Sequence, residues 1–106
     1  MAQVKFTDQA LNDLQDIAYF IGSDSSHYAS LQIQKILKRT EVLENSPNNG
    51  RVVPELNIKS IREVLEGHYR IIYLNLNNKE VHILTIHHSR RQLKRTNLKK
   101  LVKKLK

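Results

Sequence analysis

Apolar residues recur at helical spacing through the first half of the chain. The first such stripe follows Thr7, a good N-cap, and runs through Ala10, Leu11, Leu14, Ile17, Ala18 and Ile21. It ends at Gly22, a residue suited to the position just after a helix. The second stripe follows a polar segment at residues 23–26 and runs through Ala29, Ile33, Ile36, Leu37, Thr40 and Leu43. Pro47 closes it, so the first half predicts a helical hairpin preceded by a short extended run at residues 4–6.

The hydrophobic period changes to two in the second half. Residues 58–65, 68–76 and 79–87 alternate as strands do, and the dipeptides Glu66-Gly67 and Asn77-Asn78 between them suit two-residue hairpin turns. The pattern predicts an α+β fold. Its expected order is an N-terminal strand, a helical hairpin packed on an antiparallel β-meander, and a C-terminal helix, all within one domain of residues 1–106.

The two turns fix an expected register. With Glu66-Gly67 as the first loop, Glu63 faces Arg70 directly across the hairpin, which predicts an ion pair. With Asn77-Asn78 as the second loop, Arg70 faces Thr85 and shares a face with His87. A three-residue loop would instead place Arg70 on the face of His88.

Both faces of the middle strand carry large apolar side chains. Ile72 and Leu74 point to one face, and Ile71 and Tyr73 point to the other. One helical layer covers only one face of a sheet. We therefore expect the second face to be covered by the C-terminal tail, by a partner chain, or by both.

The net charge of +8 is concentrated at the C-terminus. All ten acidic residues lie at or before Glu80, and the tail at residues 90–106 carries nine cations: Arg90, Arg91, Lys94, Arg95, Lys99, Lys100, Lys103, Lys104 and Lys106. Within the tail, apolar residues at helical spacing predict an amphipathic helix: Leu98, Leu101, Val102 and Leu105. This helix either packs its leucines on the body with its lysines in water, or binds nucleic acid, anionic lipid or an acidic protein segment.

Composition excludes several classes of protein. The 106 residues contain no cysteine, so disulfides and thiolate zinc sites are absent and a reducing cytoplasmic location is expected. The N-terminus does not resemble a secretion signal, and no apolar run is long enough to span a membrane. His82, His87 and His88 alternate or adjoin on one strand and so point to opposite faces, which argues against a metal site. No cofactor is expected.

One region gathers most of the residues that bind phosphate or move protons. It extends from Ile58 to Arg91 and contains Arg62, Glu63, Tyr69, Arg70, His87, His88, Arg90 and Arg91. Such a surface on a small domain favours contact with a polyanion or with an acidic partner.

The order of several motifs resembles the RelE/ParE family of bacterial toxins from type II toxin–antitoxin modules. The motifs span about residues 4–93 and are Ala10-Leu11-Asn12-Asp13-Leu14, Tyr28-Ala29, Gly50-Arg51-Val52-Val53-Pro54-Glu55, Ile61-Arg62-Glu63, Tyr69-Arg70-Ile71-Ile72-Tyr73, and Ile83-Leu84-Thr85-Ile86 followed by His88 and Arg90-Arg91. The resemblance implies the fold expected above. It also implies a cognate antitoxin that wraps the toxin and neutralises it, for which an uncovered apolar sheet face and a cationic tail are suited.

The family contains two kinds of toxin. RelE-like members resemble endonucleases that cleave messenger RNA on the ribosome, which requires a base, an acid and cations around one phosphate. For that activity the resemblance implies Arg70 as a phosphate clamp, Arg90 or Arg91 as a second clamp, and His87 or His88 in proton transfer. ParE-like members instead inhibit DNA gyrase by binding it.

Departures from the nuclease pattern favour the ParE-like branch. Ile61 and Glu63 stand where RelE-like enzymes commonly carry lysines, and no tyrosine follows Tyr73. We therefore expect a non-enzymatic gyrase inhibitor, with the ribosome-dependent nuclease and a nucleic-acid-binding module as alternatives. The residues expected to bind the target or the antitoxin are Arg51, Arg62, Glu63, Tyr69, Arg90, Lys94, Arg95, Leu98 and Leu101.

Overall fold

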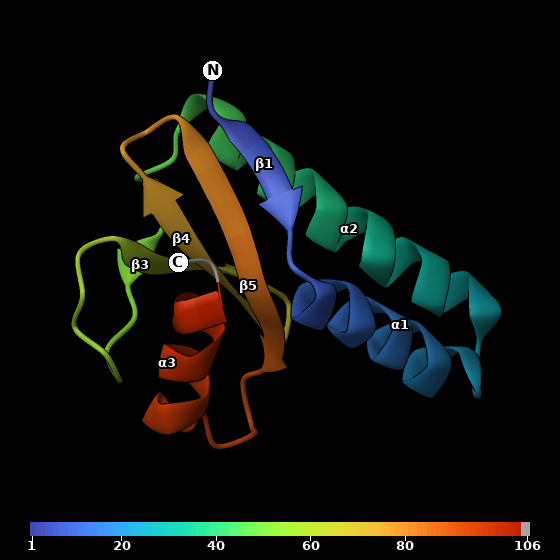
Figure 1. Ribbon diagram of the computed structural model, residues 1–106. Helices are drawn as coiled ribbons and strands as arrows, with labels where there is room; N and C mark the ends of the chain where they lie inside the picture. Colours follow the sequence, from blue (N-terminus) through green and yellow to red (C-terminus); the bar gives the residue numbers. More distant parts are fainter. Residues whose placement is uncertain (105–106) are drawn as a thin grey trace.

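A five-stranded sheet separates two helical layers of unequal size (Figure 1). The computed structural model describes residues 1–104. Its elements are β1 (Gln3–Phe6), α1 (Asp8–Gly22), α2 (Ser26–Asn45), β2 (Arg51–Val52), β3 (Ile61–Glu66), β4 (Tyr69–Leu76), β5 (Glu80–His88) and α3 (Arg95–Lys104). The strand order is β1-β5-β4-β3-β2, in which β1 runs parallel to β5 and the other pairs are antiparallel. The α+β architecture predicted from the sequence is confirmed.

The helical hairpin begins at side-chain caps. Thr7 Oγ1 accepts a hydrogen bond from the backbone N–H of Ala10 at 3.1 Å, and Ser25 Oγ caps α2 in the same way at 3.2 Å. The predicted end of α1 was wrong by one residue: Gly22 is still helical, and Ser23 is the C-cap with a φ of −62°. The reason is that the Ser23 N–H still bonds to a carbonyl of the last turn. Within residues 1–104, no helix combines the length and the apolarity required to cross a bilayer.

The first hairpin of the sheet differs from the predicted register. Its loop is Gly67-His68, with Gly67 at a φ of +58°, so that Glu63 faces Ile72 and Leu65 faces Arg70. The turn uses the glycine at its first loop position, where a left-handed backbone is needed. Glu63 and Arg70 therefore lie diagonally across the hairpin, on the same face.

The second hairpin contains two irregularities. Asn77 and Asn78 adopt positive φ as their turn requires, but Leu76 faces Glu80, which makes a three-residue loop. Opposite Ile72 and Tyr73, a β-bulge in β5 leaves Leu84 without a partner on β4 and shifts the register by one more residue. Arg70 consequently faces His87, which confirms the prediction that these two residues share a face of the sheet. The predicted two-residue loop was wrong, and so was the predicted pairing of Arg70 with Thr85.

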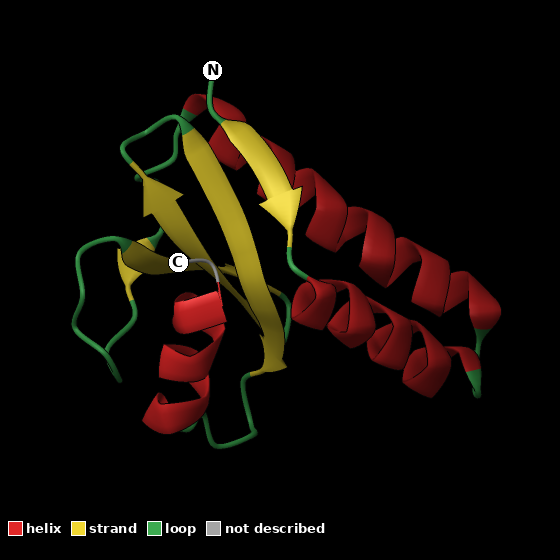
Figure 2. Cartoon of the chain, viewed as in Figure 1, coloured by secondary structure: helices red, strands yellow, loops and turns green. Residues whose placement is uncertain are grey.

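The sheet has a hydrophobic core on each face. The larger core lies under the helical hairpin and contains Ala10, Ile17, Ile36, Leu43, Val64, Ile71, Tyr73, Val81, Ile83 and Ile86. The smaller core lies under α3 and contains Val53, Leu56, Ile61, Ile72, Leu74, Leu84 and Leu98. Figure 2 shows α3 standing apart from the two-helix layer. The tail thus covers the second face, one of the three possibilities that the sequence left open. Leu105, predicted to join it, lies outside the described residues.

We expect Tyr73→Phe to lower the free energy of unfolding by about 1 to 3 kcal/mol. The buried Tyr73 hydroxyl accepts from the Gly50 N–H at 3.0 Å and donates to the Pro47 carbonyl at 2.8 Å. Position 50 admits only glycine, because a Cβ there would lie 2.4 Å from the Glu63 carbonyl oxygen. Urea denaturation measures the effect. Tyr69→Phe is the control, since Tyr69 makes no hydroxyl hydrogen bond within residues 1–104; equal losses in the two variants would contradict the prediction.

Candidate functional site

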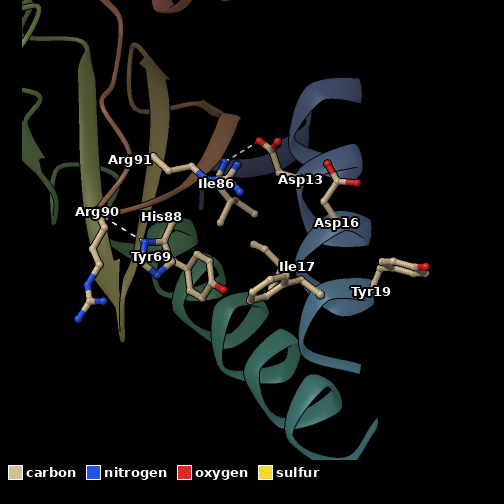
Figure 3. Close-up of a pocket in the computed structure, with 10 residues that line it drawn as sticks. Asp13, Asp16, Ile17, Tyr19, Tyr69, Ile86, His88, Arg90 and Arg91 are labelled. Atoms are coloured by element: carbon tan, nitrogen blue, oxygen red, sulfur yellow. Dashed lines mark hydrogen bonds between the residues drawn. The ribbon is translucent and has the colours of Figure 1, made fainter. Parts of the chain in front are cut away.

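A cleft of about 620 Å³ opens between α1 and the C-terminal end of β5 (Figure 3). Its lining residues are Asp13, Asp16, Ile17, Tyr19, Phe20, Tyr69, Ile86, His88, Arg90 and Arg91. The α1 wall carries two carboxylates, and the opposite wall carries two guanidinium groups that follow β5. The floor between them is apolar. A groove with this lining suits a peptide that has an apolar face and charges of both signs.

Asp13 fixes α1 to the sheet at the cleft. The strand β1 ends at Phe6, opposite Ile83, so the edge of β5 beyond that point lacks a neighbouring strand. Asp13 Oδ2 accepts hydrogen bonds there from the Ile86 N–H at 2.9 Å and from Thr85 Oγ1. One carboxylate oxygen thus takes the place of the backbone carbonyl that a neighbouring strand would have supplied, because a buried backbone N–H needs an acceptor.

His88 forms part of the sheet-side wall of the cleft. Its ring stands edge-on to Tyr69, with centroids 5.3 Å apart, and stacks on His68 at 5.9 Å. The Arg90 backbone N–H donates to Nδ1 at 3.1 Å, which assigns the ring hydrogen of neutral His88 to Nε2. Desolvation and the neighbouring cations, including Arg91, hold the pKa of His88 below its ordinary value of 6.5. These surroundings therefore favour the neutral form of the ring.

Two aromatic side chains at the tip of α1 are strongly exposed. Tyr19 is 84% exposed and Phe20 is 75% exposed, and both line the cleft. Exposed aromatic groups beside a groove mark surfaces that bind other proteins.

A chain of four charged residues lies on the opposite face of the sheet. Arg70 Nε bonds to Glu63 Oε1 at 2.5 Å, and the other Glu63 oxygen bonds to Arg51 Nε at 2.7 Å. Arg70 Nη1 and Nη2 bond to the two Glu55 oxygens at 2.7 and 2.8 Å, a bidentate pair. Glu63 is 1% exposed and Arg70 is 9% exposed. The predicted Glu63–Arg70 ion pair is confirmed, and every guanidinium nitrogen of Arg70 is bonded to a carboxylate.

A second, smaller cleft of about 330 Å³ lies beside α3. His87 lines it, and the His87 Nε2 atom lies 2.9 Å from the Arg91 carbonyl oxygen. The lining also carries the carboxylate of Asp13 and the ammonium groups of Lys94, Lys100 and Lys104.

A family model matches most of the chain. The model describes the ParE toxin of type II toxin-antitoxin system, parDE, and it matches residues 4–93. The chain belongs to the ParE toxin family. Membership makes it the toxin component of a type II toxin–antitoxin system and implies a cognate ParD antitoxin as its partner.

The fold is also similar to a solved structure of this family. The chromosomal ParDE TA system from P. aeruginosa matches with a TM-score of 0.66 and 22% sequence identity, over 83% of this chain and 96% of that chain. At this identity the likeness concerns the fold alone. Curated protein sequences give no match.

The structure divides the nuclease candidates of this ParE-family chain between two faces. Arg70 and His87 face each other on the α3 side, whereas Tyr69 and His88 form the next pair of the register and line the large cleft with Arg91. The two-residue loop expected from the sequence places Arg70 and His87 on one face in the same way, although the structure reaches this arrangement through a three-residue loop and a bulge.

The predicted binding residues also differ in exposure. Four of these residues are exposed: Arg51, which lies beside Glu63, and Arg90, Lys94 and Arg95. Three are half-buried: Arg62, Tyr69 and Leu101. Arg62 Nη1 donates to the Gly50 carbonyl at 2.9 Å. Glu63 and Leu98 are each 1% exposed, so in this conformation neither side chain is accessible to a partner, contrary to the expectation from the sequence. Glu55 and Asp13 were not among the predicted site residues.

Acid is expected to destabilise the protein through Glu55. The hydrogen bonds from Arg70 lower the pKa of Glu55 from 4.5 to about 2. Because the folded-state pKa lies below the unfolded-state value, this stabilisation is present above about pH 4.5 and is lost as pH falls toward 2. Urea unfolding across this range should show a shallower pH dependence for Glu55→Gln than for the wild type. Parallel profiles would contradict this assignment.

Proposed function

We propose that this ParE-family toxin inhibits DNA gyrase by binding it and performs no cleavage of RNA. The observation that carries the proposal is the state of Arg70, the residue on which the nuclease alternative depends. Its three guanidinium nitrogens are bonded to Glu55 and Glu63. The resulting chain of two arginines and two glutamates is neutral.

Cleavage of RNA by its own 2′-hydroxyl requires a base, an acid and a cation around one phosphate. Arg70 lies on the α3 face of the sheet, whereas His88 lies on the α1 face. One phosphate cannot contact both side chains. His87 shares the face of Arg70, but Arg70 is already held by carboxylates, which repel a phosphate.

Supercoiling of plasmid DNA by purified gyrase tests the proposal. We expect loss of supercoiling when the toxin is in stoichiometric excess, and restoration of activity when the antitoxin is added. Full supercoiling at excess toxin would contradict gyrase inhibition. In parallel, messenger RNA on translating ribosomes should stay intact, and codon-phased cleavage would instead establish the nuclease alternative.

We also propose that the large cleft beside α1 receives a segment of the antitoxin. The apolar floor and the oppositely charged walls suit an amphipathic peptide. The sheet face that the sequence offered for this partner is covered by α3. The cleft on the other face remains open, with the exposed side chains of Tyr19 and Phe20 on its lining.

Phe20→Ala is expected to weaken antitoxin binding by at least tenfold, because an exposed aromatic anchor typically contributes about 2 kcal/mol or more at an interface. Titration calorimetry with the purified cognate antitoxin measures the affinity. Tyr28→Ala is the matched control, since Tyr28 is 67% exposed on α2 and lies outside the cleft lining. Equal effects of the two substitutions on the affinity would exclude the cleft as the specific binding site of the antitoxin.

A further inference from the structure

The C-terminal part of the chain presents cations that the protein itself does not neutralise. Residues 90–104 contain Arg90, Arg91, Lys94, Arg95, Lys99, Lys100, Lys103 and Lys104, all of them exposed. Across the described residues 1–104, the ion pairs involve other basic residues, namely Lys5, Arg51, Arg70 and His82. No acidic residue occurs after Glu80. This surface therefore carries a strong positive potential.

The docking of α3 turns its cations outward. Leu98 is buried against the sheet, and Leu101 and Val102 pack against the same core. The helix stands at the surface of the molecule, as Figure 1 shows. Its solvent-facing side is left with lysine, arginine and short polar residues. Positions four residues apart, such as Lys99 and Lys103, lie about 6 Å apart along the helix axis.

The small cleft beside α3 extends this cationic surface into a groove. Lys94, Lys100 and Lys104 line it together with the amide side chains of Gln92 and Asn97. Its only carboxylate among the described residues is Asp13, whose Oδ2 atom already accepts hydrogen bonds from β5. Ammonium and amide groups together are the donors that bind phosphodiester oxygens.

We propose that α3 and this groove bind the phosphodiester backbone of a nucleic-acid duplex without reading its sequence. This function goes beyond gyrase inhibition and does not depend on it. Lysines act as mobile point charges rather than as planar base readers, so the contact is to the backbone. No phenylalanine, tyrosine or tryptophan occurs after Tyr73, and among the described residues His87 is the only aromatic ring on the groove. The surface therefore lacks the series of stacking rings typical of proteins that bind single strands.

Two other polyanionic partners fit the surface less well. An amphipathic helix that binds membranes inserts apolar side chains into the lipid, whereas Leu98 is 1% exposed because it packs on the sheet. An acidic peptide that binds specifically requires apolar anchor pockets as well as charge. The leucines on the groove, Leu93, Leu98 and Leu101, are buried or half-buried, and the outward side of α3 offers only polar and charged side chains.

The test compares two double substitutions that remove the same charge from the full-length protein. Lys100→Gln/Lys104→Gln removes two cations of α3 that line the groove, and Lys35→Gln/Lys38→Gln removes two exposed cations from α2. Fluorescence anisotropy with labelled DNA and RNA duplexes of about 20 base pairs, at about 50 to 200 mM salt, gives the affinity and its salt dependence. Each lost phosphate contact lowers the slope of log K against log salt by about 0.9.

We expect the α3 variant to lower that slope by about 1.8, so that its loss of affinity relative to the wild type is about twelvefold greater at about 50 mM than at about 200 mM salt, and we expect the α2 variant to match the wild type. Comparison of the DNA and RNA duplexes shows whether the protein binds the backbone of DNA, of RNA or of both. Absence of binding to both duplexes at about 50 mM salt would overturn the proposal. Equal losses in the two variants would also overturn it, as would binding to anionic vesicles or to polyglutamate without binding to either duplex. Circular dichroism establishes that both variants are folded.

Discussion

Glu63→Ala is expected to lower the free energy of unfolding by about 3 to 5 kcal/mol. Glu63 is 1% exposed and bonds to both Arg70 and Arg51. Removal of its carboxylate leaves the buried guanidinium of Arg70 with Glu55 as its remaining ionic partner. The cost arises from the unpaired Nε–H of Arg70 and from the net positive charge left on the network, more than from the lost contact itself.

Urea denaturation measures this effect against a control on the same strand. Glu66→Ala should change the free energy of unfolding by less than about 0.5 kcal/mol, since Glu66 forms no ion pair within residues 1–104. The double variant Glu63→Leu/Arg70→Met should be more stable than Glu63→Ala, because it removes both buried charges. A Glu63→Ala variant as stable as the wild type would show that the network does not depend on this carboxylate.

Leu98→Ala is expected to cost about 2 to 5 kcal/mol, the range for large-to-small substitutions in a core. Leu98 is the only fully buried side chain of α3 in the described residues and packs in the core that includes Leu84. Leu101→Ala, at a half-buried position of the same helix, should cost less.

Trypsin provides a second readout of the same variant. The lysines of α3 are cleavable once the helix leaves the sheet, so cleavage in the tail should be faster in Leu98→Ala than in the wild type. Unchanged unfolding together with unchanged cleavage would contradict the packing of α3 described above.

The sequence predicted the helical part of the fold well, for identifiable reasons. The stripes in α1 and α2 have a clear period, and Thr7 and Pro47 mark boundaries through local chemistry. The amphipathic tail was also predicted to be helical, and Leu98 faces the body as its spacing indicated. These features are determined by residues close to one another in the sequence, which is why the sequence alone predicts them.

The register of the strands depends on less local information. Glu66-Gly67 and Gly67-His68 are both acceptable loops, and the choice between them is made by packing against the helices. The bulge in β5 has no sequence signal of its own, because Leu84 and Thr85 continue an ordinary strand pattern. Glu55 could have been suspected as the only carboxylate between residues 45 and 62, but its distance from Arg70 is set by the fold of the loop.

The three-residue loop and the bulge in the second hairpin compensate for each other. Either one alone would move every side chain at the end of β5 to the opposite face of the sheet. Because both are present, the faces are those of a regular two-residue hairpin: His88 faces the large cleft and His87 faces α3. A deletion of one residue at either place would exchange the two imidazoles between the faces, whereas deletion at both would preserve them. In the evolution of this hairpin, insertions and deletions should therefore occur in pairs, one at the turn and one in the strand.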